Sequence, residues 1–202
     1  MYKVEFNTKE EWKKARLSCL TGTTVGKYIG IISPYAPKSD EEMAKNPAVQ
    51  FGVNCETSIL TIFSNLPSVA KDLLLKPTIK PTLWYSDDDN RIAGSFDALA
   101  YEKGQNGFAE CKSTSAGLYD LKNWVIPNTT WLQIIHYFSL DNSLQFCYLV
   151  VCSYHKWGDW GAKIDYVRIP RVMVQSRIDN LKSWHRYILD NKGQEHERIE
   201  FI

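Results

Sequence analysis

Residues 144–154 read LQFCYLVVCSY and form a long run of β-branched and aromatic side chains. Such a run is typical of a strand that is buried inside a sheet. The alternating segment KIDYVRIPR, residues 163–171, predicts another strand after it. Residues 171–191 then predict a long amphipathic helix. Its apolar side chains on or near one face are Val174, Ile178, Leu181 and Ile188.

Helices are also predicted earlier in the chain. The segment TKEEWKKARL, residues 8–17, predicts a short helix in which Thr8 is the N-cap and Glu11 completes a capping box. Residues 48–64 predict a helix that buries one apolar stripe. A further helix is expected to begin near Thr129 or Thr130.

Between these helices, residues 78–113 have the pattern of a meander of three strands, with SDDDN and EKGQNG as the turns. Residues 33–47 contain turn and helix-breaking residues and predict a surface loop. The order of elements predicts a mixed α/β fold built on one sheet. We expect a single domain over residues 1–202.

The composition argues against several classes of protein. Hydrophobic residues make up 44% of the chain and aromatic residues 13%, which is too much for a disordered chain. The net charge of +1 means that any nucleic-acid binding depends on a local patch. Five cysteines without a CxxC pair argue against a zinc or iron–sulfur site and fit a reducing cytosol. The charged N-terminal segment is no signal peptide, and no long apolar run is present, so we expect a cytoplasmic protein without a membrane span.

The segment GFAECKS, residues 107–113, places a carboxylate and an ammonium group two positions apart in an apolar strand. Glu110 and Lys112 point to the same face, because side chains alternate along a strand. The preceding strand carries Asp97, and a short turn at residues 102–107 joins the two strands. Antiparallel pairing of these strands can bring Asp97 close to Glu110.

Two neighbouring carboxylates are costly to bury unless a cation compensates them. Mg²⁺ suits Asp97 and Glu110, with the main-chain carbonyl of Cys111 as a further ligand. Lys112 can then orient an attacking water and, if the cation lowers its pKa, help to deprotonate it. Two polar side chains of predicted helices can reach the same cluster, namely Glu56 and Gln133. The pattern therefore predicts phosphodiester hydrolysis.

Simpler interpretations exist for several polar residues. An isolated E-x-K pair is commonly a salt bridge on a solvated strand face. The acidic run at residues 87–89 reads as a solvated turn, and His136 as a structural residue with satisfied hydrogen bonds. Trp157 and Trp160 form an aromatic pair for which local packing, base contact and a protein interface all stay open.

With these motifs in order, the chain resembles the PD-(D/E)XK nuclease superfamily, and within it the lambda-exonuclease-like (YqaJ-type) phage recombination exonucleases. The resemblance runs from about residue 12 to residue 140. WKKARLSCLTGTTVGKYIG is similar to the opening of that family, GVNCE to its G…E helix motif and GSFDALA to its SPDG segment. ECK is similar to its E-x-K strand, and WLQIIHYFSL to its Q-x-x-x-Y helix. Phe96 and Ala98 depart from the family pattern without removing a ligand.

The resemblance implies a restriction-endonuclease-like fold, with a central mixed β-sheet flanked by helices. The catalytic residues that it implies are Glu56, Asp97, Glu110, Lys112 and Gln133. The metal ligands that it implies, for Mg²⁺ or a substituting Mn²⁺, are Asp97, Glu110, the Cys111 carbonyl and Glu56. Arg16 and Thr23 match the positions that bind a terminal 5′-phosphate, although a surface helix residue is the simpler interpretation of Arg16.

The activity that the resemblance implies is that of an Mg²⁺-dependent DNA exonuclease. It would resect double-stranded DNA ends from 5′ to 3′ and leave 3′ overhangs for recombination by strand annealing. A ring-shaped homotrimer and a single-strand annealing protein are the implied partners, in the cytoplasm of a bacterial host. Two alternatives stay open: an endonuclease of the same fold that acts on specific sequences or structures, and a non-catalytic DNA-binding protein.

Overall fold

The computed structural model describes residues 1–32, 45, 47–115, 118–154 and 162–191. Most of the loop predicted at residues 33–47 lies outside these residues, as do Trp157 and Trp160. Among the described helices, none combines the length and the apolar character that crossing a membrane requires.

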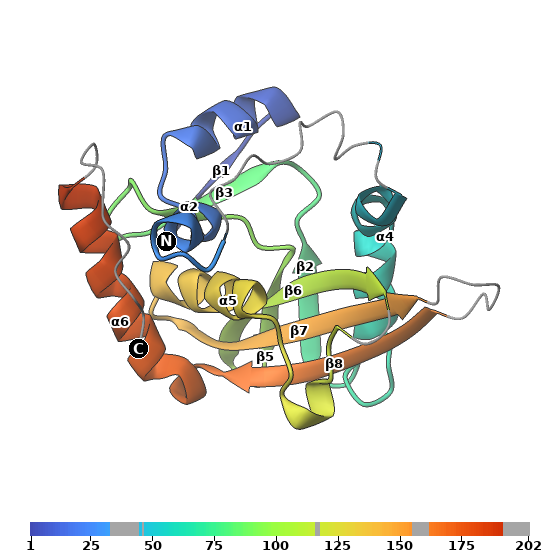
Figure 1. The fold of residues 1–202 in the computed structure, drawn as a ribbon. Helices are drawn as coiled ribbons and strands as arrows, with labels where there is room; N and C mark the ends of the chain where they lie inside the picture. Colours follow the sequence, from blue (N-terminus) through green and yellow to red (C-terminus); the bar gives the residue numbers. More distant parts are fainter. Residues whose placement is uncertain (33–44, 46, 116–117, 155–161, 192–202) are drawn as a thin grey trace.

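A five-stranded sheet lies at the centre of the fold (Figure 1). Its strands, in spatial order, are β2 (Leu73–Pro77), β5 (Ala98–Glu102), β6 (Gln105–Ser115), β7 (Leu144–Tyr154) and β8 (Ala162–Pro170). The β6–β7 pair is parallel and the other pairs are antiparallel, so the sheet is mixed, as predicted. A parallel pair needs a long crossover, and here it contains a helix, α5 (Asn128–Leu140).

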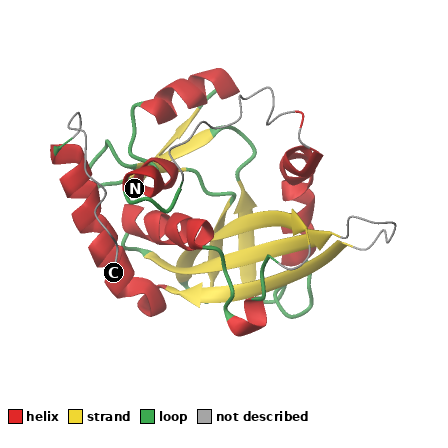
Figure 2. Cartoon of the chain, in the orientation of Figure 1, coloured by secondary structure: helices red, strands yellow, loops and turns green. Residues whose placement is uncertain are grey.

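Strand β7 is buried on both faces, as its composition predicts. Leu149 belongs to the core cluster on one face of the sheet, and Val150 belongs to the cluster on the other. Helices cover both faces (Figure 2). The first face packs against α2 (Gly22–Tyr28), α5 and α6 (Arg171–Asp190), and the second packs against α4 (Pro47–Ser64).

The β5–β6 hairpin fixes the register of the polar residues. Lys103 and Gly104 form its turn with φ values of 49° and 80°, and a turn of this hand suits the right-handed twist of the strands. Ala98 pairs with Ala109. The next position along each strand therefore places Asp97 opposite Glu110.

The prediction of one sheet is wrong, because the first strand of the expected meander belongs to a second sheet. That sheet has the order β1 (Tyr2–Glu5), β3 (Thr82–Tyr85), β4 (Ala93–Gly94). Strand β3 pairs along its length with the N-terminal segment, which is distant in the sequence and which no local pattern identifies. The apolar stripe predicted for α4 is buried only in part, since Leu60 and Phe63 are buried whereas Val53 is 63% exposed.

Helix α1 (Lys9–Leu17) begins as predicted. The Thr8 side chain accepts a hydrogen bond from the Glu11 N–H, and the Glu11 carboxylate accepts one from the Thr8 N–H. The indole of Trp12 donates to the Thr82 carbonyl at 3.1 Å, so α1 is attached to the second sheet. This attachment places the next turn of α1, with Arg16, over the cavity described below.

Candidate active site

Asp97 directly precedes β5, and Glu110 lies opposite it on β6, the other strand of the hairpin. The Asp97 carboxylate accepts a hydrogen bond of 2.7 Å from the N–H of Cys111, the residue after Glu110. Burial raises the pKa of Asp97 well above its usual range, and repulsion from Glu110 and then from Glu56 adds to this increase. The structure therefore brings together the two carboxylates that the sequence predicted to share a cation.

Lys112 lies beside Glu110 on the same face of β6. Its Nζ donates hydrogen bonds to Glu110 Oε1 and, at 2.8 Å, to Gln133 Oε1. Burial lowers the pKa of Lys112, but attraction to Glu110 and Asp97 outweighs burial, so the pKa lies above its usual value. Lys112 is therefore an ammonium group in this arrangement and acts as a hydrogen-bond donor.

Gln133 and Tyr137 lie one turn apart on α5 and continue this chain of hydrogen bonds. Gln133 Nε2 donates to the Tyr137 hydroxyl at 2.7 Å, and that hydroxyl donates to the Ser95 carbonyl at 2.6 Å. Because the Tyr137 hydroxyl donates its only proton to the Ser95 carbonyl, its oxygen can only accept a hydrogen bond from the NH₂ group of Gln133. The amide oxygen of Gln133 is thereby turned toward Lys112.

Glu56 approaches the cluster from α4. Burial raises the pKa of its half-buried carboxyl group, repulsion from Glu110 raises it further, and attraction to Lys112 opposes both. Since Glu56 interacts electrostatically with Glu110 and Lys112, its carboxyl group lies near these two residues of β6. A helix on the second face of the sheet thus adds a third carboxylate near the site.

One atom of the cluster shows that the residues fit a cation. Glu110 is 1% exposed, and its Oε2 is buried without a hydrogen-bond partner. An unpaired buried carboxylate oxygen is costly, and a cation compensates it. Within the described residues no group of three or more His, Cys, Asp or Glu side chains could by itself hold a metal. Asp97 and Glu110 therefore offer carboxylate oxygens of the kind that hard cations such as Mg²⁺ bind.

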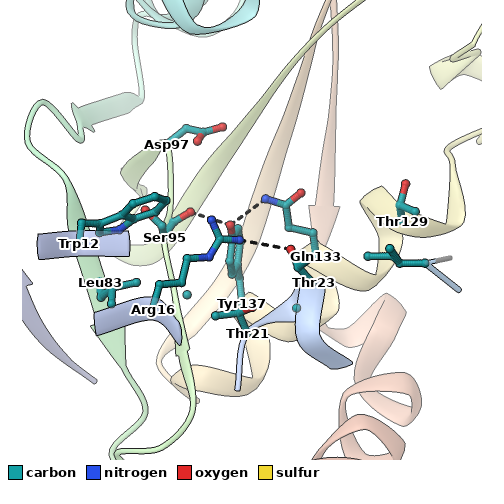
Figure 3. Close-up of a pocket in the computed structure, with 13 residues that line it drawn as sticks. Trp12, Arg16, Thr21, Thr23, Leu83, Ser95, Asp97, Thr129, Gln133 and Tyr137 are labelled. Carbon is teal, nitrogen blue, oxygen red and sulfur yellow. Dashed lines mark hydrogen bonds between the residues drawn. The ribbon is translucent and has the colours of Figure 1, made fainter. Parts of the chain in front are cut away.

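Arg16 and Thr23 lie in the same cavity as Asp97 and Gln133 (Figure 3). The cavity has a volume of about 400 Å³. Arg16 donates to the Thr23 hydroxyl at 3.2 Å, and its guanidinium lies 5.0 Å from the centre of the Trp12 ring. Arg16 is half-buried, and the Thr23 hydroxyl and the Trp12 ring hold its guanidinium at the cavity.

Among the comparisons with known proteins, only the comparison with solved structures found similar proteins. No family model and no curated protein matches the sequence. The fold matches the crystal structure of an alkaline exonuclease (LHK-Exo) from Laribacter hongkongensis, with a TM-score of 0.58 and 18% identity over 91% of this chain and 96% of that chain. A structure of LHK-Exo in complex with dAMP matches with a TM-score of 0.57 and 17% identity over the same shares.

The chain has the same fold as this alkaline exonuclease. This finding confirms the predicted restriction-endonuclease-like α/β architecture and the resemblance to lambda-exonuclease-like proteins at the level of fold. At 18% identity the likeness shows the fold alone, so the roles of individual residues rest on the geometry described above.

In this alkaline exonuclease fold His136 has the structural role that the sequence predicted. Its ring nitrogens contact His185 Nε2 at 3.2 Å and the Ala93 carbonyl at 2.9 Å. Burial lowers the pKa of His136 to about 4, so the imidazole is neutral. In the acidic run, Asp88 and Asp89 pair with Lys182 and Arg91, and the turn is solvated as expected.

Thr129 and Ser95 are among the contributors to the cavity that had no sequence-based prediction. Thr129 lines it one turn before Gln133, and the spacing of Thr129, Gln133 and Tyr137 on one helix face was a signal that could have identified it. Ser95 contributes a main-chain carbonyl to the hydrogen-bond chain. No residue type predicts that contribution, because every residue has a carbonyl.

Proposed function

We propose that this protein is an Mg²⁺-dependent DNA exonuclease that resects duplex ends from 5′ to 3′ and leaves 3′ overhangs for strand annealing. The observation that carries the proposal is the unpaired Oε2 of Glu110 beside the Lys112 ammonium group. The exonuclease fold supports it, and the neighbour's complex with dAMP fits a site for a deoxynucleotide.

In this proposal each side chain has a defined task. Asp97, Glu110 and the Cys111 carbonyl would hold Mg²⁺, or Mn²⁺ in its place, and Glu56 would complete the metal site. The bound cation supplies a water of lowered pKa and neutralises charge on the phosphate. Lys112 donates a hydrogen bond that orients the attacking water, and Gln133 holds Lys112 in place.

Arg16 and Thr23 are proposed to bind the terminal 5′-phosphate. A guanidinium fork and a hydroxyl are good phosphate ligands, and both lie in one cavity with Asp97. Arg16 is oriented by Thr23 and by the Trp12 ring before any ligand arrives. Binding at this place would favour cleavage from a phosphorylated 5′ end.

The proposal extends to assembly and location. A ring-shaped homotrimer would let a chain of net charge +1 retain DNA by enclosing it. A single-strand annealing protein would take the 3′ overhang. The reaction would occur in the bacterial cytoplasm.

The proposal is tested by replacing Lys112 with Ala and measuring digestion of end-labelled linear duplex DNA in Mg²⁺. We expect the rate to fall at least about a hundredfold, since a group that orients the nucleophile contributes on this scale. Digestion by Lys112→Ala at the parent rate would refute the site. Lys76→Ala, at an exposed lysine of β2, is the control.

Substrate form separates the proposal from its alternatives. The parent protein should digest linear DNA with 5′-phosphate ends faster than DNA with 5′-hydroxyl ends, and should leave a closed circular plasmid intact. Cleavage of the circle would indicate an endonuclease. Binding of DNA without cleavage in Mg²⁺ or Mn²⁺ would indicate a non-catalytic protein.

A further inference from the structure

A second cavity lies on the other side of α5 from the active site. It has a volume of about 360 Å³ and is lined by residues of α2, α5 and α6 and the segments next to them. Neighbouring residues divide the two cavities: Thr129 lines the active-site cavity, and Asn128 lines the second one. In the same way Ile32 lines the first cavity, and Ile31 the second. The two cavities therefore adjoin at the start of α5 and at the segment that follows α2.

Two indole rings are among the groups that line the second cavity. Trp131 and Trp184 line it, together with aliphatic side chains of the core. The Trp131 ring stacks on Trp124 with centroids 6.4 Å apart and an angle of 16° between the planes. Trp124 is 40% exposed, so the stack extends from the cavity to the surface.

The loop that presents Trp124 is closed by its own hydrogen bonds. Asp120 and Val125 exchange main-chain hydrogen bonds of 3.0 and 2.9 Å. Trp124 itself has a φ of 58°, a left-handed conformation that is rare for a bulky residue. Such conformations persist where the surrounding structure imposes them, and they occur frequently at functional sites.

Polar groups at the second cavity are available to a ligand. Asn128 and Asn180 line it, are exposed, and make no hydrogen bond through their carboxamides within the described residues. Arg177 lies with its guanidinium 5.6 Å from the centre of the Trp131 ring. Among the described residues, no acidic side chain pairs with Arg177. The cavity thus combines two indole side chains, two amide groups and a guanidinium group that has no acidic partner among the described residues.

We propose that this cavity binds an unpaired nucleobase of the DNA whose end occupies the active site, with Arg177 contacting the adjoining phosphate. Indole rings stack on any base, carboxamides can bond its polar edge, and arginine supports both stacking and phosphate contact. An apolar side chain of a protein partner would fill the cavity without using Asn128, Asn180 or Arg177. The inference rests on the proposed function, because it takes DNA as the substrate.

The test measures binding without cleavage, so that it does not depend on catalysis. The full-length protein is titrated in EDTA with a fluorescent oligothymidylate, and with an oligomer of the same length in which abasic sites replace the thymines. We expect the parent to bind oligothymidylate about tenfold more tightly than the abasic oligomer, as one stacked base can contribute. Equal affinity for the two would overturn the proposal.

Matched variants on α6 locate the effect. Arg177→Gln should weaken oligothymidylate binding about fivefold, and Asn180→Leu should reduce the preference over the abasic oligomer. Arg186→Gln removes the same charge from the same helix but lines a different cavity, and it should bind as the parent does. An equal loss in Arg177→Gln and Arg186→Gln would mean a general charge effect and would overturn the site. A parent that digests duplex DNA but fails this test would leave the proposed function intact.

Discussion

Lys112 illustrates how single side chains are held at the residue scale. Its ammonium group lies between the Glu110 carboxylate and the Gln133 amide oxygen. An amide can rotate by half a turn at little cost, which would present its NH₂ group to Lys112 and repel it. The Tyr137 hydroxyl prevents this, because it already donates to Ser95 and can only accept from Gln133. Tyr137 is therefore a positioning residue.

We expect Tyr137→Phe to reduce kcat about tenfold and to leave KM for DNA nearly unchanged. The loss corresponds to about one hydrogen bond that orients Gln133. Steady-state digestion of linear duplex DNA measures it. Tyr119→Phe is the control, since Tyr119 bonds Thr130 outside this chain of hydrogen bonds. A larger effect for Tyr119→Phe than for Tyr137→Phe would contradict the assignment.

At the scale of elements, the end of α5 is stabilised by a buried arginine of α6. The Nη1 of Arg171 donates to the carbonyls of Phe138, Asp141 and Leu144 at 2.9, 3.0 and 3.2 Å. Carbonyls at the end of a helix lack partners within it. Arg171 supplies hydrogen-bond donors to such carbonyls. The first turn of α6 therefore fixes the end of α5, the helix that carries Gln133.

We expect Arg171→Met to lower the free energy of unfolding by about 3 kcal/mol. The variant leaves buried carbonyls without donors, and hydrogen bonds to charged groups are worth about 1.5–3 kcal/mol each before compensation. Urea unfolding followed by circular dichroism measures the loss. Arg186→Met, at an exposed position of the same helix, should change stability by less than about 0.5 kcal/mol. Equal stability of Arg171→Met and the parent would refute this role.

At the scale of the whole molecule, the buried carboxylates of the site lower the free energy of unfolding unless a cation compensates their charge. Burial raises the pKa of both Asp97 and Glu110, which means that folding with both groups ionised has a cost. The fold places these carboxylates together although simple stability would separate them. Such a conflict is typical of a functional site.

We therefore expect Mg²⁺ to raise the melting temperature of the parent protein. Ligand binding to the folded state alone contributes about 1.4 kcal/mol at ten times Kd, or about 3 °C for a chain of this size. Glu110→Gln lacks one of the two carboxylates proposed to hold the cation, so its melting temperature should be the same in EDTA and in Mg²⁺. Differential scanning calorimetry in EDTA and in Mg²⁺ decides this, with Lys76→Ala as the control. An equal Mg²⁺ shift in Glu110→Gln would place the cation elsewhere.

Local sequence patterns were sufficient to predict several elements of the structure. The capping box of Thr8 and Glu11 set the start of α1, the apolar run of β7 marked a strand buried on both faces, and the tight turn at Lys103–Gly104 put Asp97 opposite Glu110. These features depend on side-chain period, on capping and on turn geometry over a few residues. Residues that are close together in the sequence determine such properties.

Other features exist only because distant segments meet. Strand β3 pairs with β1, which lies outside the expected meander. Arg16 and Thr23 line the same cavity as Asp97. The Tyr137 hydroxyl donates a hydrogen bond to the Ser95 carbonyl. No local period specifies which surfaces come into contact, since that depends on the packing of the whole core. The carboxylates and the lysine could thus be chosen from the sequence, whereas the cavities around them required the folded chain.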